Sequence, residues 1–432
     1  MIAHLCRIVW NRRRANLLVG LELVAAFLVL FAVSTLAAFA FTSWFEPTGV
    51  EWRGVWDVEI DSQTSTDDTW SVEAVATSDA LGRAAREFSE VEDVALASLA
   101  PFELGGMNSQ HNVRGRRIEY GANEVSDRYR DVLGLRVVEG RWFGPEDDGQ
   151  AYDPVVITQR MRDEVFGSGP AVGESLQDEE VRPDQSRQTD TGGAGTADPA
   201  SVSAAQASRA RFARKPTRIV GVIAHYREDG EFDQQRHFVL YRKNVAAPTS
   251  ARDRPARHLV VRVGPGVTAA FEQALVTRLQ QAAPGWSFEV RTLERMRESS
   301  LRMTYIPLAA VGFVAASLIA MTGLGLVGVL WQAVTQRTRE LGLRRAKGAT
   351  VRHVRRQIVG EMLVLTTLAV VPAAAVAVQA PISGIFSWID GRIYVIGLAA
   401  ATVTLYVLSW LCAWYPARLA TRLSPADALR YE

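Results

Sequence analysis

The chain of 432 residues has 48 basic and 47 acidic residues and a formal net charge of +1. This balance hides a division, because residues 46–302 hold 32 basic and 41 acidic residues, whereas residues 337–356 hold eight basic residues and one acid. The polar middle of the chain therefore carries no basic patch, and nucleic-acid binding is not expected. The sequence contains no phosphate-binding loop, Gly-x-Ser-x-Gly nucleophile or zinc-ligand spacing, so we expect neither an enzyme site nor a metal site.

Four apolar runs are each long enough to cross a bilayer, which requires about 20 helical residues. We predict membrane spans at residues 17–45, 306–331, 358–380 and 393–415. The first run is much longer than the apolar part of a signal peptide, so we interpret it as a retained anchor. Its 29 residues exceed what a bilayer needs, and either tilt or projection beyond the membrane surface would accommodate the excess.

The distribution of arginine predicts the orientation of these spans, because basic segments stay on the cytoplasmic side. Residues 1–16 contain four arginines and no acid. We therefore place three segments in the cytoplasm, namely the N-terminus 1–16, the loop 332–357 and the tail 416–432. Residues 46–303 and the short loop 381–392 then lie outside. Cys6 and Cys412 both fall toward the reducing side, so no disulfide is expected.

The outer region has the pattern of a mixed α and β domain, and its two ends share a strand–helix–strand order. In the later unit, strand-like alternation begins at His258 and again at Ser287. The helix predicted between them places Phe271, Leu275 and Leu279 on one face. Two such units can pair into one ferredoxin-like sheet.

The earlier unit has a weaker pattern. We predict a strand at Trp70–Ala76, a helix at Ser78–Phe88 and a second strand that begins at Val91. Ser78 fits the N-cap of that helix, because a serine hydroxyl accepts a hydrogen bond from a free backbone N–H of the first turn.

The predicted fold class is thus a membrane protein with four transmembrane α-helices and a large extracytoplasmic α+β domain. Its ferredoxin-like part is predicted at about residues 46–105 and 256–303, with an inserted β-rich subdomain at about 106–255. Strand-like segments of the insertion begin at Gly134, Asp153, Thr217 and Phe238. Residues 177–214 are rich in small polar residues and are predicted to form a flexible insert. We expect the many acids of the domain to form a solvated surface.

A basic segment between the second and third spans has more structure than membrane topology requires. Gly348 fits the end of one helix, where a left-handed residue is needed, and Thr350 fits the N-cap of the next. Gly342 thins the first helix and would let another backbone approach. The alternative is that the charge serves topology alone, but this alternative does not require Glu340, Gly342 or the Gly-Ala-Thr turn.

Two further motifs are candidates for contacts. In the tail, Ser424 and Pro425 form a helix start that is followed by Leu429, and this short helix would either dock to a partner or lie on the bilayer. In the second span, Gly312, Ala316 and Ala320 recur at a spacing that lets helices approach closely. Such residues are common in spans, so a dimer contact and ordinary packing both remain open.

The basic segment and the tail carry a resemblance to a known family. "QRTRELGLRRAKGATVRHVRRQIVGEMLVL" resembles the signature of the FtsX-like permease domains of ABC transporters of the MacB/FtsX type, and "PARLATRLSPADALRYE" is similar to the C-terminal motif of that family. "YRDVLGLRVVEGRWFGPED", "DPVVITQRMRDEVFGS" and "RIVGVIAHYRED" resemble the MacB-like periplasmic core domain. The resemblance covers nearly the whole chain.

The resemblance implies a four-helix permease that works as a dimer with a second copy or a related permease. It implies that ATP and Mg bind to a separate ABC ATPase subunit, that this chain binds no cofactor, and that closure of the ATPase is relayed to the outer domain, which has a porter part. The residues implied in ATPase coupling are Glu340, Gly342, Arg345, Gly348, Ala349 and Thr350, and those implied in C-terminal docking are Ser424, Pro425, Leu429 and Arg430. Lys347, where the family usually has an apolar residue, and the length of 177–214 are departures from the pattern.

The expected localisation is the bacterial cytoplasmic membrane, in contact with lipid and with both termini inside. The leading functional hypothesis is export through a periplasmic adaptor and an outer-membrane channel. Lipoprotein extraction of the Lol type is the second hypothesis, and regulation of a cell-wall hydrolase is the third. From a different class, a membrane-bound sensor or scaffold without transport would share the same topology, but it would not copurify with an ATPase.

Overall fold

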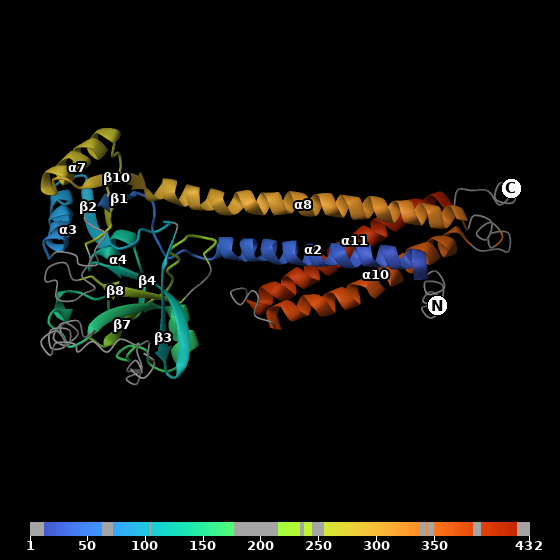
Figure 1. Ribbon diagram of the computed structural model, residues 1–432, viewed down its shortest axis with the longest axis horizontal. Coiled ribbons are helices and arrows are strands. Elements are labelled where there is room, and N and C mark those ends of the chain that lie inside the picture. Colours follow the sequence, from blue (N-terminus) through green and yellow to red (C-terminus); the bar gives the residue numbers. More distant parts are fainter. Residues whose placement is uncertain are drawn as a thin grey trace, which may run out of the picture. The chain divides into compact units, whose positions relative to one another are not determined.

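We obtained a computed structural model of the protein that describes residues 13–62, 72–103, 105–176, 215–233, 237–243, 255–336, 343, 350–382 and 390–420. The chain divides into two compact units. A helical unit comprises Met1–Phe45 and Thr304–Glu432, and an α/β unit comprises Glu46–Met303. The two units are drawn together in Figure 1, and each is described below by itself.

The helical unit is built from α2 (Arg13–Phe45), α8 (Leu293–Gln336), α10 (Val351–Ile382) and α11 (Gly391–Ala420), with α8 beginning in the α/β unit. Each of these four helices is long and apolar enough to cross a membrane. α10 begins at Val351 and therefore includes the last residues of the predicted loop 332–357. This start agrees with the prediction of Thr350 as an N-cap, and the arginines that follow suit the helix, since arginine is a good helix former.

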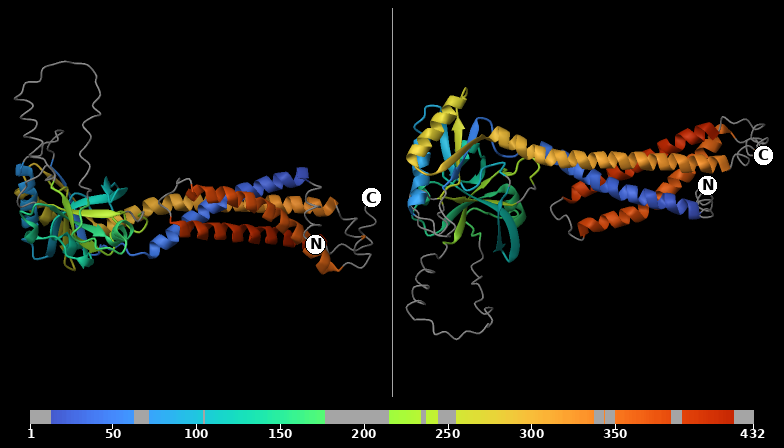
Figure 2. Two further views of the ribbon diagram at one scale, coloured as in Figure 1. Left: turned by 90° about the horizontal axis from the view of Figure 1, so that it is seen from below. Right: turned by 45° about the horizontal axis from the view of Figure 1, so that its top comes forward.

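Helices α2, α10 and α11 pack against one another (Figures 1 and 2), and small residues lie in the cluster between them. Ala373 of α10 and Ala401 of α11 are fully buried beside Phe27 of α2, and Leu326 of α8 joins the same cluster. Small side chains let membrane helices approach closely, where dispersion contacts stabilise them. At Gly397 a Cβ atom would lie 2.2 Å from Thr35 Oγ1, so only glycine fits between α11 and α2 at this point.

Within its described residues, the α/β unit contains one ten-stranded sheet in the order β10-β1-β9-β2-β4-β8-β6-β7-β5, with β3 paired to β4. Its strands are β1 (Val55–Asp61), β2 (Val91–Ala97), β3 (Met107–Val113), β4 (Arg116–Val125), β5 (Val137–Gly140), β6 (Asp153–Thr158), β7 (Thr217–Ile223), β8 (Phe238–Arg242), β9 (His258–Val263) and β10 (Ser287–Thr292). Its helices are α3 (Val72–Ala85), α4 (Tyr129–Leu133), α5 (Gln159–Phe166) and α7 (Ala269–Ala282), with a 3₁₀ turn, η1, at Pro145–Asp147.

The first four strands in this order form the predicted ferredoxin-like part, with α3 and α7 on one face (Figure 1). The predicted helix face is confirmed, because Phe271, Leu275 and Leu279 of α7 are buried. Strand β9 lies between two cores. Leu259 joins the core under the helices and Val260 joins the core on the opposite face, which explains why β9 is buried on both sides. Each buried Leu or Val contributes about 1.5–3 kcal/mol to stability.

The predicted start of the earlier unit is wrong. The first strand is β1 at Val55–Asp61, and the residues expected to form a strand at Trp70–Ala76 belong from Val72 onward to helix α3. Buried positions in α3 recur three or four residues apart, which is the period of a helix. Ser78 is therefore inside the helix rather than at its N-cap. Its hydroxyl donates to Ala74 O at 3.2 Å and accepts from Ala256 N at 3.0 Å, which ties α3 to the chain before β9.

The remaining strands form the inserted β-rich part. Strands begin at or near the predicted positions, at Val137, Asp153, Thr217 and Phe238. The β3–β4 hairpin was not predicted, and it turns through Arg114 and Gly115 at φ 52° and 72°, as a two-residue hairpin loop requires. The two parts of the sheet meet at a single register pair of β2 and β4, Ala97 with Val125. The predicted flexible insert 177–214 lies outside the described residues.

Candidate coupling site

The described part of the predicted coupling segment begins at Thr350, which caps α10. Thr350 Oγ1 accepts a hydrogen bond from His353 N at 3.3 Å, and Thr350 O accepts one from Val354 N at 3.2 Å. These are the contacts of an N-cap, as the sequence predicts. The other residues of the coupling and docking predictions lie outside the described residues, namely Glu340, Gly342, Arg345, Gly348, Ala349, Ser424, Pro425, Leu429 and Arg430.

The helix ends next to this segment are held together by a small apolar cluster. Val354 and Ile358 of α10 and Ala417 of α11 are buried together, and Leu330 and Val334 of α8 pack against them. The coupling loop joins α8 to α10 and the tail follows α11, so this cluster gathers the three helix ends from which both predicted contact segments leave.

The same turns of α10 carry positive charge. Arg352 and Arg356 are exposed, whereas the guanidinium carbon of Arg355 lies 5.0 Å from the ring centroid of Trp414 in α11. This cation–π contact fixes one arginine against a neighbouring helix and adds to the apolar cluster. Two arginines therefore remain available to lipid head groups or to a protein partner.

The small-residue motif of the second span lies on an uncovered face of α8. Gly312, Ala316 and Ala320 are exposed, and a Cβ atom at Gly312 would meet nothing within 4 Å. Phe313 and Leu324, which are 75% and 74% exposed, are also uncovered by the described part of this chain. Lipid or a second helix can contact these residues, so the dimer contact stays a prediction.

In the α/β unit, a buried ionic triad links strands β1 and β9 to the chain after β2. Asp57 and His258 are fully buried, with His258 Nδ1 3.1 Å from Asp57 Oδ1, and His258 Nε2 lies 2.9 Å from Glu103 Oε2. Burial opposes the charged imidazolium, but the two carboxylates raise the pKa of His258 to about 9. Burial raises the pKa of Asp57, although His258 and Arg291 oppose this effect.

The triad corrects the expectation that the acids of this domain form a solvated surface. Sequence reasoning missed it because Asp57 and His258 are 201 positions apart. The available signal was an aspartate at the centre of the apolar run that forms β1, since a charge at such a position needs a partner. In the part of the chain that the structure describes, no group of three or more His, Cys, Asp or Glu residues is arranged to hold a metal ion.

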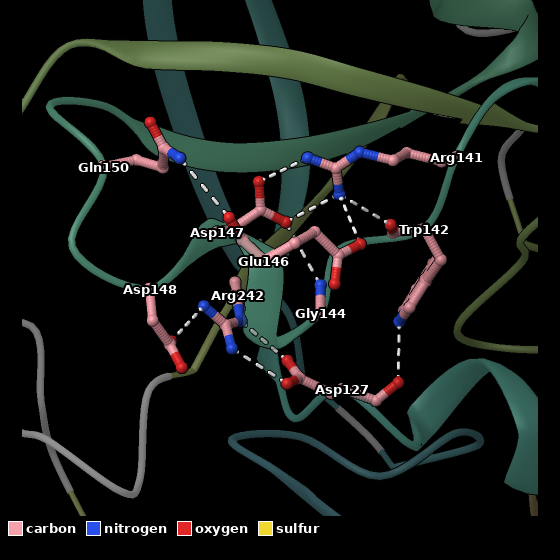
Figure 3. A network of polar contacts seen from close by, with 9 residues as sticks. All are labelled: Asp127, Arg141, Trp142, Gly144, Glu146, Asp147, Asp148, Gln150 and Arg242. Atoms are coloured by element: carbon pink, nitrogen blue, oxygen red, sulfur yellow. Dashed lines mark hydrogen bonds and ion pairs between the residues drawn. The ribbon is translucent and has the colours of Figure 1, made fainter.

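A second polar network holds the turn between β5 and β6 (Figure 3). Asp147 is buried in η1 and accepts hydrogen bonds from Arg141 Nη1 at 2.7 Å and from Gly144 N at 3.1 Å. Burial alone would raise the pKa of Asp147, but the Arg141 guanidinium holds it below its usual range. Arg242 of β8 binds both Asp127 and Asp148, at 2.7 Å each. This network orders the segment "RWFGPEDDGQ" and joins it to the centre of the inserted part.

Family models match both units of the chain. The MacB-like periplasmic core domain matches residues 24–278, and the FtsX-like permease C-terminal domain matches residues 312–425. The first match covers more than half of the chain. Together with the four apolar helices and the α/β unit, these matches define a multi-pass membrane permease of the ABC transporter class.

The chain belongs to the family of MacB/FtsX-like ABC transporter permeases, as its sequence motifs indicated. It is 22% identical over 315 residues to the uncharacterized ABC transporter permease YknZ of Bacillus subtilis, a match that covers 72% of this chain and 70% of the relative. It is 26% identical over 333 residues to the macrolide export ATP-binding/permease protein MacB of Chromobacterium violaceum, covering 74% of this chain and 45% of the relative. A pyoverdine export ATP-binding/permease protein, PvdT of Pseudomonas syringae, is 22% identical over 315 residues, covering 72% of this chain and 42% of the relative.

This chain therefore spans less than half of the length of the MacB and PvdT relatives that it matches. Among solved structures, the periplasmic region of MacB from Actinobacillus actinomycetemcomitans is 12% identical, with a TM-score of 0.37, and the match covers 60% of this chain and 97% of that one. The extracellular domain of YknZ from Gram-positive bacteria is 12% identical, with a TM-score of 0.33, and the match covers 54% of this chain and 99% of that one.

Proposed function

We propose that this permease relays ATP-driven motion of a separate ABC ATPase subunit to its extracytoplasmic domain, and that this motion exports a substrate. The observation that carries the proposal is the match of both a MacB-like core domain and an FtsX-like permease domain on one chain. Permeases of this family work with ABC ATPase partners. In this proposal ATP and Mg bind to the partner, and this chain contributes no catalytic residue.

The proposed contact with the ATPase is the segment between α8 and α10 together with the tail. Glu340, Gly342, Arg345, Gly348 and Ala349 would form the contact, with Thr350 at the start of α10. Ser424, Pro425, Leu429 and Arg430 would dock the tail. The apolar cluster of Val354, Ile358 and Ala417 supports this arrangement, because it makes the ends of three helices respond together to a force on either segment.

The proposed topology places both termini and this contact in the cytoplasm, with residues 46–303 outside. We propose that two permeases pair, either as two copies or as a copy and a paralogue, with Gly312, Ala316 and Ala320 at their contact. The names of relatives that export macrolides or pyoverdine favour export over lipoprotein extraction. A periplasmic adaptor and an outer-membrane channel are then the expected outer partners.

Copurification is the first test of the proposal. The full chain, expressed in its own host and purified in mild detergent, should bring down an ATPase of about 25 kDa, as expected for one domain of typical size. Repeated purification without any ATP-hydrolysing protein would leave the sensor or scaffold hypothesis in its place.

Variants of the contact segment give the second test. The measurement is the factor by which the permease changes the rate of ATP hydrolysis in the reconstituted complex. Glu340→Lys and Gly348→Leu should each reduce this factor at least about fivefold, which is the smallest effect usually seen when two sites are coupled. Glu272→Lys is the matched control, because it reverses an exposed charge on α7. Coupling equal to wild type in both test variants, with normal membrane insertion, would contradict the assigned contact.

A further inference from the structure

The loop between β7 and β8 contacts two chain segments that continue into membrane helices. Residues 224–233 of this loop are described, and Arg227, Glu228, Glu231 and Asp233 are all buried although they are charged. One contacting segment, Glu46–Gly54, directly follows α2. The other is the first two turns of α8, from Leu293 to Ser300.

Arg227 holds the segment that follows α2. Its backbone N–H donates to Thr48 O at 3.0 Å, and its guanidinium lies 3.8 Å from the carboxylate of Glu46. The same guanidinium donates to Asp233 O at 3.0 Å within the loop. Arg227 is 4% exposed, so its backbone bond to Thr48 and its bond to Asp233 are shielded from water, whereas the Glu46 side chain is 44% exposed. At Gly49 a Cβ atom would lie 2.1 Å from His225 O, which shows how closely the backbones approach.

Arg297 holds the first turns of α8 to the same loop. Its Nε donates to Glu231 Oε1 at 2.6 Å, and its guanidinium carbon lies 4.6 Å from the ring centroid of Trp52. Ser300 Oγ donates to Asp229 O at 2.9 Å one turn further along α8. Because Trp52 belongs to the segment after α2, Arg297 bridges the loop and both membrane-linked segments.

The other side of the loop reaches the middle of the sheet. Phe102 N donates to Glu228 O at 2.7 Å, and Asn123 Nδ2 of β4 donates to Glu228 Oε1 at 3.2 Å. Phe102 has a φ of 67°, which is strained for a residue with a side chain, and a Cβ atom at Gly230 would lie 3.1 Å from its ring. The loop therefore contacts the chain between β2 and β3 as well as β4, where the two parts of the sheet meet.

We propose that Arg227, Glu231 and Arg297 form a clasp through which movement of α2 and α8 enters the α/β unit. They are positioning residues: the clasp binds no substrate, but it makes the two membrane-linked segments move together with the β7–β8 loop. Charged groups that are buried and paired keep one geometry, because separation leaves a desolvated charge. The proposal rests on the proposed function, since it presupposes that nucleotide binding moves the membrane helices.

The test compares backbone hydrogen exchange in the full chain bound to its ATPase in lipid nanodiscs, with and without a non-hydrolysable ATP analogue. In wild type, we expect the analogue to change exchange in β4, β8 and the β7–β8 loop. Arg297→Ala and Glu231→Gln should each reduce this nucleotide-dependent change at least about fivefold. A change of about fivefold is the smallest effect usually seen when two sites are coupled. Exchange without nucleotide should stay near wild type outside the β7–β8 loop and the two segments it contacts, which a merely structural role would not predict.

Two further variants make the result specific. The exchanged pair Glu231→Arg with Arg297→Glu should restore the nucleotide response, because it rebuilds the ion pair with reversed polarity. Arg278→Ala is the control, since it breaks an exposed ion pair with Glu87 (2.8 Å) that touches neither membrane-linked segment, and it should leave the response unchanged. If Arg297→Ala fails to fold, Arg297→Lys replaces it, because lysine keeps the charge but loses the planar fork.

The outcomes separate this inference from the proposed function. A wild-type complex whose α/β unit does not respond to nucleotide would overturn both. A wild-type response that the clasp variants retain in full would overturn the clasp alone and leave the relay in place. Loss of response in the Arg278→Ala control to the same degree would also overturn the clasp, because any broken ion pair would then have the same effect.

Discussion

Asp57 and His258 lie in neighbouring strands with 3.1 Å between Oδ1 and Nδ1, and neither side chain is exposed to solvent. The pair sits in the core that faces α4, and Glu103 completes it from the chain after β2. An ionic group in this position fixes how the ferredoxin-like strands meet the following segment. It also makes the stability of the α/β unit depend on pH.

We expect the stability of the α/β unit to fall as the pH rises from about 6.5 to 9. The pKa of His258 is raised from 6.5 to about 9, so its contribution is fully present below pH 6.5 and is lost as the pH rises through the folded value. This rise in the pKa of His258 corresponds to roughly 2–4 kcal/mol of folding free energy. Glu103 affects stability at acidic pH. Its pKa is lowered in the folded state, so its contribution is lost as the pH falls through that lowered pKa. The raised pKa of Asp57 opposes the gain from Glu103.

Thermal unfolding of the full chain across this pH range is the measurement, with His258→Gln as the comparison. The variant removes the titrating group, so its unfolding temperature should change much less between pH 6.5 and 9. Arg291 and Arg257 also face the two carboxylates, but arginine does not titrate in this range. Parallel pH profiles for wild type and variant would show that His258 is not responsible.

Asp147 should be far more important to stability than its neighbour Glu146. Asp147→Ala removes a buried acceptor from Arg141 and Gly144 N, and hydrogen bonds to charged groups contribute about 1.5–3 kcal/mol each. Glu146→Ala is a matched control, because Glu146 contacts Arg141 at 3.0 Å but its side chain is 57% exposed. An exposed pair contributes at most about 1 kcal/mol. Chemical denaturation of both variants would give the two values, and equal losses would be evidence against this assignment.

Gly397→Ala should destabilise the helical unit, because the added methyl group would clash with Thr35 in α2. Overpacking of this kind costs about 1–3 kcal/mol. Gly20→Ala is the control, since nothing lies within 4 Å of a Cβ atom there. Thermal stability in detergent should fall for the first variant and stay constant or rise slightly for the second. A Gly397→Ala protein as stable as wild type would mean that α2 and α11 are not in contact at this point.

Gly312→Leu and Ala316→Leu should reduce the dimer fraction in lipid without unfolding the chain. Both positions are exposed on α8, so a larger side chain meets nothing in this chain but would separate two helices packed through small residues. The mass of the intact complex reports the number of permeases. A dimer that persists in both variants would place the contact elsewhere.

The sequence allowed the spans and most strands of the inserted part to be predicted, because both depend on local patterns. The long apolar runs set the four helices, and the alternating runs from Asp153 and Thr217 became β6 and β7. The first strand was missed because β1 carries Asp57 on the face that is buried, which a pattern of apolar alternation does not anticipate. The β3–β4 hairpin was missed because β3 is almost entirely polar.

The partners in the ionic contacts could not be predicted from the sequence. Arg297 meets Glu231 from 66 positions away and His258 meets Asp57 from 201 positions away, so only the folded topology brings these charges together. The N-cap at Thr350 was predictable, because its hydrogen bond joins residues only three positions apart in the sequence. The roles of the coupling and docking residues remain predictions, since all but Thr350 lie outside the described residues.

The single register pair between β2 and β4 limits how far a change in one part of the sheet can reach into the other. Ala97 and Val125 are the point at which the ladder of one part ends and that of the other begins. Strands beyond this pair could be lengthened, shortened or replaced without altering the register of β10, β1, β9 and β2. The inserted part can therefore change in length and sequence while the four-stranded frame keeps its geometry.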